Sequence, residues 1–165
     1  MLQGNKVKLR ACEPGDLSLL LDWENDTRSW KITGTYIPFS QHTLEKYLSQ
    51  VHDLFADRQF RFIFCESKTN NPVGMIDLFD FEPHHLRAGI GILVGNSEDR
   101  SMGYGKDALH ALINYSREIV GLRILYCYIL EDNDASIKLF EGAGFKRIAT
   151  LEKWHRKQDF YLSEH

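Results

Sequence analysis

The sequence predicts an α/β (α+β) protein in which helices flank both faces of a mixed, mostly antiparallel central sheet. Three strand-like segments, 60–66, 73–81 and 87–95, follow one another with short connections, which is typical of an antiparallel meander. After residue 95 the pattern changes to helix, strand, helix and strand, which indicates parallel pairing beside the meander. Because no repeat, low-complexity tract or linker divides the chain, we expect one domain over residues 1–165.

The first half is expected to begin with a strand at Val7–Ala11, followed by a helix that opens at Pro14. Residues 25–39 show no clear period and predict a loop with a short helix. Ser40 is a typical N-cap for a second helix. We expect that helix to bury a stripe formed by Leu44, Tyr47 or Leu48, Val51 and Phe55.

The second half is expected to contain a helix over 105–120, a strand over 123–130, a helix over 133–143 and strands over 145–153 and 160–162. One face of the first of these helices is apolar and consists of Ala108, Leu112, Tyr115 and Ile119. Gly144 is predicted to end the next helix in a left-handed conformation, with Phe145 making the apolar contact of the cap.

Composition and charge exclude several classes of partner. The net charge of −3 and the pI near 6.2 lack the basic surplus that nucleic-acid binding needs, whereas a cationic small molecule is compatible with them. No apolar run reaches bilayer length, so we expect no membrane partner. Cys12, Cys65 and Cys127 are far apart and indicate reduced core thiols in a cytoplasmic protein. His84-His85 lacks a third ligand at suitable spacing, so we expect no metal site.

The segment between the third meander strand and the next helix predicts an anion site. Gly103 and Gly105 let the backbone turn tightly, and the unpaired N–H groups of the helix N-terminus suit a pyrophosphate. An ordinary glycine-rich loop is an equally good interpretation of this segment by itself. The segment Gly103–Ala108 also fits a dinucleotide fingerprint, with Glu131 as the ribose-binding acid. The seven-residue gap after Gly95 and the preceding meander disfavour that interpretation.

The strand before this loop contains three glycines, Gly89, Gly91 and Gly95. Glycine weakens a strand and often marks a bulge or a place where another backbone or a ligand approaches closely. A ligand arm that pairs with this strand would explain the glycines. Tight packing under a helix is the competing explanation, and it is equally good for Gly89.

A third motif, Asn-x-x-Ser-x-x-Leu-Phe-x-x-x-Gly-Phe over 133–145, completes an ordered pattern with the strand and the Arg-x-x-Gly-x-Gly loop. This pattern resembles the GCN5-related N-acetyltransferase (GNAT) superfamily over essentially the whole chain. Segments 7–10, 73–80 and 84–91 are most similar to the bacterial spermidine N-acetyltransferase and ribosomal-protein acetyltransferase branch. The resemblance implies a GNAT-like fold, acetyl-coenzyme A as co-substrate, a small-molecule amine as acceptor, and a possible homodimer.

The resemblance also implies which residues contact coenzyme A. The backbone of the glycine-rich strand would pair with the pantetheine arm, the loop would hold the pyrophosphate, and the motif over 133–145 would face the cofactor. Asn133 has a second explanation as the N-cap of its helix. The predicted cofactor-binding residues are Ile92, Leu93, Val94, Arg100, Ser101, Met102, Gly103, Tyr104, Gly105, Lys106, Asn133, Ser136 and Phe140.

The chemistry of direct transfer requires a neutral amine and a stabilised oxyanion. We expect Asp77 to act as general base, because a carboxylate on an apolar strand face has a raised pKa; pairing with an arginine is the alternative. Related enzymes often have a tyrosine acid where this chain has Phe140, which cannot donate a proton, so the candidates to substitute for it are a water, Ser136 or a nearby tyrosine.

The acids predicted to hold a polyamine are Glu24, Asp80 and Glu82, each with a solvated surface charge as the alternative. The expected function is acetyl transfer to a spermidine-like polyamine or another small amine. Acetylation of a protein N-terminus is one alternative. A module that binds acetyl-coenzyme A without catalysis is another, and Phe140 motivates it.

Overall fold

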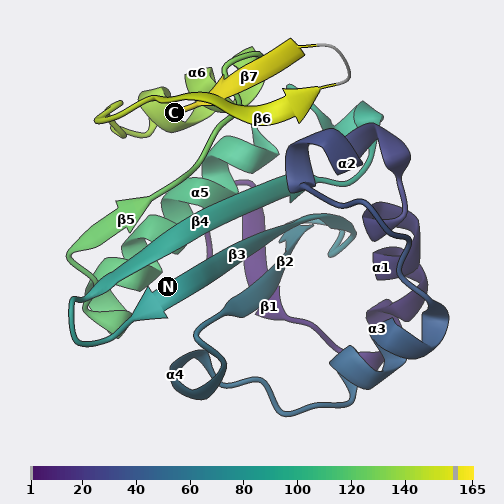
Figure 1. Cartoon of the computed structure of the whole chain (residues 1–165). Coiled ribbons are helices and arrows are strands. Elements are labelled where there is room, and N and C mark those ends of the chain that lie inside the picture. Colours follow the sequence, from purple (N-terminus) through teal and green to yellow (C-terminus); the bar gives the residue numbers. More distant parts are fainter. Residues whose placement is uncertain (1, 158–159) are drawn as a thin grey trace.

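A computed structural model describes residues 2–157 and 160–165. Its central sheet has the strand order β1 (Val7–Ala11), β2 (Phe60–Glu66), β3 (Pro72–Glu82), β4 (Arg87–Val94) and β5 (Ile124–Tyr126) (Figure 1). β1 to β4 pair antiparallel and β5 joins β4 in parallel, so the predicted mixed sheet and its meander are confirmed.

The first half of the chain forms the 3₁₀ turn η1 (Pro14–Asp16) and the helices α1 (Leu17–Glu24), α2 (Thr27–Thr33), α3 (Gln41–Leu48) and α4 (Leu54–Asp57). Two of these helices, α1 and α3, cover one face of the sheet. Buried side chains of α1 and α3 pack on this face of the sheet, where Trp23 and Met75 share one apolar cluster. The short helix predicted within 25–39 is α2.

The predicted long stripe after Ser40 is wrong beyond Leu48. Ser40 does cap α3 by accepting the Thr43 N–H, but the helix ends at Leu48. Asp53 then caps the separate helix α4, accepting the N–H groups of Phe55 and Ala56. Val51 and Phe55 are therefore exposed, because α3 has ended and this local cap begins a separate helix.

The opposite face of the sheet is covered by α5 (Tyr104–Tyr115), which continues into a π-helical turn, η3 (Ser116–Val120). Ala108 and Leu112 are fully buried, as predicted. Ile119 is exposed, so its predicted place on the apolar face is wrong. The π turn has more residues per turn than an α-helix and rotates later side chains away from that face.

The C-terminal quarter contains α6 (Asp134–Gly142) and a hairpin of β6 (Leu151–Lys157) and β7 (Phe160–Glu164), which lies beside the central sheet rather than in it (Figure 1). Gly144 has the predicted left-handed φ of 93°, and the Phe145 N–H donates to Phe140. The strands predicted over 123–130 and 145–153 are both wrong in extent, because regular pairing covers only β5 in the first and begins at Leu151 in the second.

Candidate active site

The edge of β4 that faces β5 is open over half of its length. β5 pairs with β4 only as far as Gly89, and beyond that point no described strand pairs with this edge. A ligand arm that carries amide groups can hydrogen-bond to such an edge as an added strand does.

Backbone groups of successive strand residues point to opposite edges, which decides which residues face the opening. The Gly95 N–H donates to the Val73 carbonyl at 2.9 Å, so Gly95 faces β3. Alternation then directs the N–H and C=O of Val94 and Ile92 toward the opening, and those of Leu93 toward β3. Of the three residues predicted to pair with a pantetheine arm, Ile92 and Val94 have the required orientation.

The predicted phosphate loop follows β4 and the 3₁₀ turn η2 (Ser97–Asp99). Ser101 and Gly103 have φ values of 63° and 83°, and Gly103 is the N-cap of α5. Left-handed residues in such a turn bring N–H groups to one side, where they can bind an anion together with the helix N-terminus. Arg100 and Lys106 are exposed beside it. The loop therefore presents N–H groups and two cations that an anion can contact.

The N-terminal segment holds this loop in place through the contacts of Asp107 and Lys6 that follow, which we call the latch and which the sequence did not reveal. Asp107 accepts the backbone N–H groups of Asn5, Lys6 and Val7 at 3.0, 2.7 and 2.9 Å. The Lys6 Nζ donates to the Met102 carbonyl at 2.8 Å. An acid in a first helical turn is common, so no sequence pattern distinguishes Asp107 as a residue that binds a segment a hundred positions away.

Three elements meet beside the open edge. A Cβ built on Gly105 of α5 would lie 3.5 Å from the Val94 side chain, 3.7 Å from that of Ile92 and 3.9 Å from that of Leu139 in α6. α6, which carries the motif over 133–145, therefore lies beside the start of α5 and the open edge. These contacts place β4, the start of α5 and α6 around one space.

The residues predicted on α6 lie around its two ends. Asn133 accepts the Ser136 N–H at 3.2 Å, so its explanation as an N-cap is confirmed. Ser136 is half-buried in the first turn. Phe140 is buried, and its ring packs edge-on against Phe145 with 5.0 Å between centroids. Phe140 also lines a hollow of about 970 Å³ between β5, α6 and the segment that follows α6.

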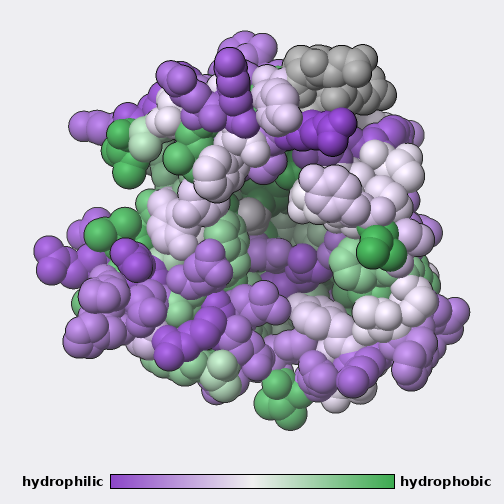
Figure 2. All heavy atoms as spheres, viewed as in Figure 1, coloured by the Kyte–Doolittle hydropathy of each residue, from purple (hydrophilic) through white to green (hydrophobic). Residues whose placement is uncertain are grey.

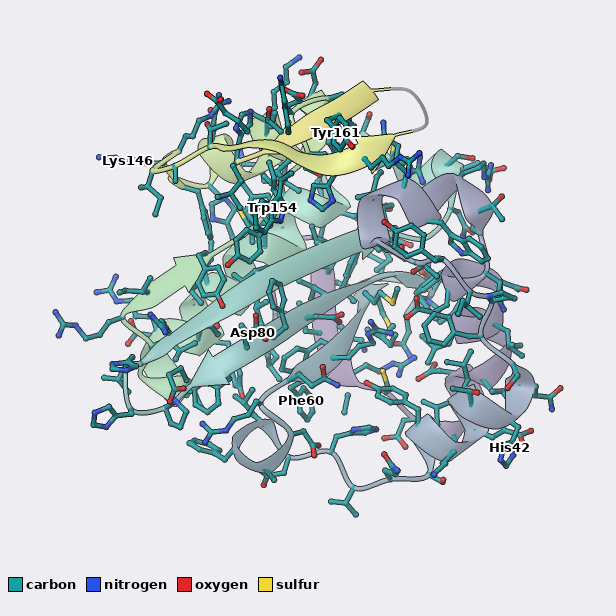
Figure 3. The ribbon with its side chains drawn as sticks, in the orientation of Figure 1. His42, Phe60, Asp80, Lys146, Trp154 and Tyr161 are labelled. Carbon is teal, nitrogen blue, oxygen red and sulfur yellow. The ribbon has the colours of Figure 1, made fainter. Side chains whose placement is uncertain are left out.

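A pocket of about 250 Å³ lies on the other face of the sheet, beside α1 and α3. Figure 2 shows the surface from the same side as Figure 1, with a hollow between the β6–β7 hairpin and the rest of the molecule. No described residue of that hairpin lines the pocket of about 250 Å³. Polar and charged side chains share the pocket wall with aromatic rings, one of which is Phe60 (Figure 3). The lining residues are Glu24, Phe39, Thr43, Leu44, Tyr47, Gln59, Phe60, Arg61, Asp77, Leu78 and Phe79.

Arg61 joins two acids in the wall of this pocket. Its Nε and Nη2 donate to the two oxygens of Asp77 at 2.9 and 2.8 Å, and its Nη1 donates to Glu24. Burial opposes the charge of Arg61, but the carboxylates of Asp77 and Glu24 outweigh it and raise the pKa of the guanidinium above its ordinary value. Two acids and one base give the cluster a net charge of −1, which favours a cation.

This cluster corrects two expectations about the acids. Asp77 is not an unpaired carboxylate on an apolar face, because the arginine pairing that was its alternative is confirmed. The surface-charge alternative is wrong for Glu24, whose side chain is 8% exposed. Asp80 is exposed, and Glu82 approaches Arg58 at 3.9 Å, so neither acid joins the cluster.

The sequence did contain a sign of Arg61, since it is a charged residue inside the apolar strand 60–66. In the sheet Arg61 lies directly opposite Asp77. Among residues 2–157 and 160–165 no group of three or more His, Cys, Asp or Glu side chains is arranged to hold a metal ion. No helix in the described part of the chain is long and apolar enough to cross a membrane.

Comparisons with known proteins cover nearly the whole chain. The chain is 25% identical over 161 residues to spermidine N(1)-acetyltransferase of Vibrio cholerae, covering 96% of this chain and 87% of that protein. A crystal structure of spermidine N-acetyltransferase from Vibrio cholerae with CoA and spermine superposes with a TM-score of 0.86 at 21% identity, covering 96% of this chain and 92% of that one. A GNAT-family acetyltransferase from Bacillus anthracis superposes with a TM-score of 0.81 at 18% identity, covering 99% and 93%.

The model of the acetyltransferase (GNAT) domain family matches residues 6–146, which include the open edge of β4, the phosphate loop and the α6 motif. The chain therefore belongs to the GNAT acetyltransferases and is an N-acetyltransferase that uses acetyl-coenzyme A.

Proposed function

We propose that this N-acetyltransferase acetylates a primary amine of a spermidine-like polyamine by direct attack. The observation that carries the proposal is the pocket with the Glu24–Arg61–Asp77 cluster, which combines a net negative charge with aromatic walls. Alkylammonium groups favour both features. The similarity to spermidine N(1)-acetyltransferase of Vibrio cholerae supports the same acceptor class.

The pocket borders the strand that carries the open edge. Asp77 is the cross-strand partner of Gly91 in β4, one residue before Ile92. A Cβ on Gly91 would meet only the Phe79 ring, at 3.9 Å, among the described residues. The absence of a side chain at Gly91 therefore leaves space for an amine to approach the β4 edge from the pocket.

The residues around the open edge fit coenzyme A. Ile92 and Val94 offer backbone groups to the pantetheine arm, and the loop Arg100–Lys106 offers N–H groups and two cations to the pyrophosphate. When bound, acetyl-coenzyme A supplies an activated acetyl group as a thioester. We assign the oxyanion hydrogen bond to the N–H of Ile92, the backbone donor beside Gly91 that faces the opening.

Asp77 is proposed to bind and orient the acceptor ammonium. Both of its oxygens already accept hydrogen bonds from Arg61, so we assign Asp77 the binding of the acceptor rather than proton abstraction. An alkylammonium has a pKa near 10.4 and gives its proton to water before the amine attacks, so the reactive neutral amine becomes more abundant as pH rises. If Asp77 serves for binding, kcat/KM should rise with pH from 7 to 9; Asp77 as an efficient base would flatten that rise.

The Ser136 hydroxyl, at the start of α6, is proposed to donate a hydrogen bond to the leaving thiolate, which then takes its proton from water. Phe140 has no proton to give, and its burial in the core leaves the donor role to another group. A thiol has a pKa near 8.5, so its anion leaves readily near neutral pH and a weak donor suffices.

The test is thiol release from acetyl-coenzyme A with a panel of acceptors: spermidine, spermine, short diamines, aminoglycosides and N-terminal peptides. We expect the polyamines to give the highest kcat/KM, and Glu24→Gln to lower it about 10-fold by removing one hydrogen-bonded charge. Glu118→Gln, an acid on the surface of η3, is the matched control and should change nothing. Preference for peptides would favour N-terminal acetylation, and binding without release for any acceptor would favour a non-catalytic module.

A further inference from the structure

Three aromatic rings form a continuous cluster, which we call the aromatic step: Phe79 of β3, Tyr126 of β5, and Tyr128, two residues after β5. Phe79 lies 6.1 Å from Tyr126 and 6.5 Å from Tyr128, and the two tyrosines lie 5.5 Å apart, measured between ring centroids. The Phe79 ring reaches β5 by crossing Gly89, where a Cβ would lie 2.3 Å from it. Gly89 is therefore needed for the cluster to form.

An acid stands beside the aromatic step. The pairing of β3 with β4 slips by one residue between Phe79 and Glu82, and Asp80 lies in this bulge with a φ of 47°. Bulges redirect side chains and are frequent beside active sites. Burial is the main cause that raises the pKa of Tyr126, and the nearby Asp80 carboxylate raises it further, so Asp80 lies close to that hydroxyl. Figure 3 labels Asp80 near the exposed end of β3.

The aromatic step continues the wall of the acceptor pocket. Phe79 lines that pocket together with Asp77, two residues away on the same strand and on the same face. Two residues of an extended strand span about 7 Å, which is comparable to the spacing of neighbouring amines in a polyamine. Tyr128, at the other end of the step, is 56% exposed, so the step leads from the pocket to solvent.

A purely structural role would not explain the two exposed members of this arrangement. Tyr128 keeps more than half of its surface in water although it contacts two other rings, and Asp80 adopts a left-handed conformation that non-glycine residues rarely take. Electron-rich ring faces beside a carboxylate are the features that bind alkylammonium groups. The exposed guanidinium of Arg87 in β4 also lies near Tyr126 and acts in the opposite direction, lowering the pKa of that hydroxyl.

We infer that the aromatic step and Asp80 bind the second, non-reacting ammonium group of the acceptor while the first amine occupies the pocket beside Asp77. This inference rests on the proposed function and deepens it. The step would make the enzyme select acceptors that carry two cationic groups joined by a short alkyl chain. Monoamines would fill the pocket without reaching the step.

The test compares ring and non-ring side chains at Tyr128. Tyr128→Leu keeps an apolar side chain but removes the ring, and we expect it to lower kcat/KM for spermidine about 5-fold, through KM. Tyr128→Trp should restore the wild-type value, because tryptophan binds cations best. The matched control is Tyr161→Leu on β7, since Tyr161 is also 56% exposed and lies outside the step; it should change nothing.

A second variant probes the acid without disturbing the bulge. Asp80→Asn keeps a residue that tolerates positive φ and should also raise the KM for spermidine about 5-fold, with the KM for acetyl-coenzyme A unchanged. Thermal melting of each variant checks that the fold is intact.

The outcomes separate the inference from the proposed function. If wild type acetylates spermidine but Tyr128→Leu and Asp80→Asn do so within 2-fold of it, the aromatic step is overturned and the proposed function stands. An equal loss in Tyr161→Leu would likewise overturn it. A wild type that acetylates no polyamine would overturn both.

Discussion

Replacement of Arg61 by methionine removes the cation that joins Glu24 and Asp77. The side chains of these acids are 8% and 28% exposed, so two charges would remain beside each other with little water. Breaking a buried ion pair from one side destabilises a protein by about 3–5 kcal/mol. Since Asp77 retains some solvent, we expect about 3 kcal/mol for Arg61→Met. For a chain of this size that lowers Tm by about 6–12 °C.

The assay is thermal and urea unfolding followed by circular dichroism. The matched control is Arg117→Met, which breaks the exposed Arg117–Glu118 pair and should cost less than about 1 kcal/mol. The triple variant with Glu24→Gln and Asp77→Asn should recover most of the lost stability, because it leaves no uncompensated charge. This account of the cluster would be refuted if Arg61→Met were as stable as Arg117→Met. It would also be refuted if the triple variant were no more stable than Arg61→Met.

Two further predictions concern the loop and the thiols. Asp107→Ala should weaken coenzyme A binding about 10-fold and lower the free energy of unfolding by about 2 kcal/mol, since three N–H groups lose their acceptor. The control is Asp134→Ala, which removes an acid from the first turn of another helix. Equal effects of the two variants would contradict the role of the latch. Burial raises the pKa of Cys12 from 9.0 to about 12 and that of Cys127 to about 11. These two thiols of the folded protein should therefore alkylate slowly at pH 8, and rapid labelling of the folded protein would contradict this. The stability that the neutral Cys12 thiol contributes should be complete below pH 9 and should be lost as pH rises toward 12.

The meander could be predicted from the sequence because its signals are local. Apolar alternation and turn residues defined β2, β3 and β4 nearly to the residue. The loop before α5 was predictable for the same reason, since glycines and a helix N-terminus announce an anion site within one short segment.

The errors arose where a second local signal competed with the periodic one. Asp53 begins its own helix, which interrupted a stripe that otherwise continued to Phe55. The π turn after Tyr115 moved Ile119 off the buried face, and no residue pattern marks such a turn in advance.

The acceptor site depended on contacts between distant residues. Arg61 meets partners 16 and 37 positions away, so Asp77 was recognised as a site residue while its partner was missed. The latch between Lys6 and Met102 spans 96 positions. Sequence periodicity describes faces of single elements and contains no information on which distant faces meet.

The most direct test of the central claim is a crystal structure of this chain with coenzyme A and spermine. We predict that the pantetheine arm lies along the β4 edge at Ile92 and Val94, and that one primary amine of spermine lies within hydrogen-bonding distance of Glu24 or Asp77. A cofactor that leaves this edge free, or spermine bound only outside the pocket, would contradict the account.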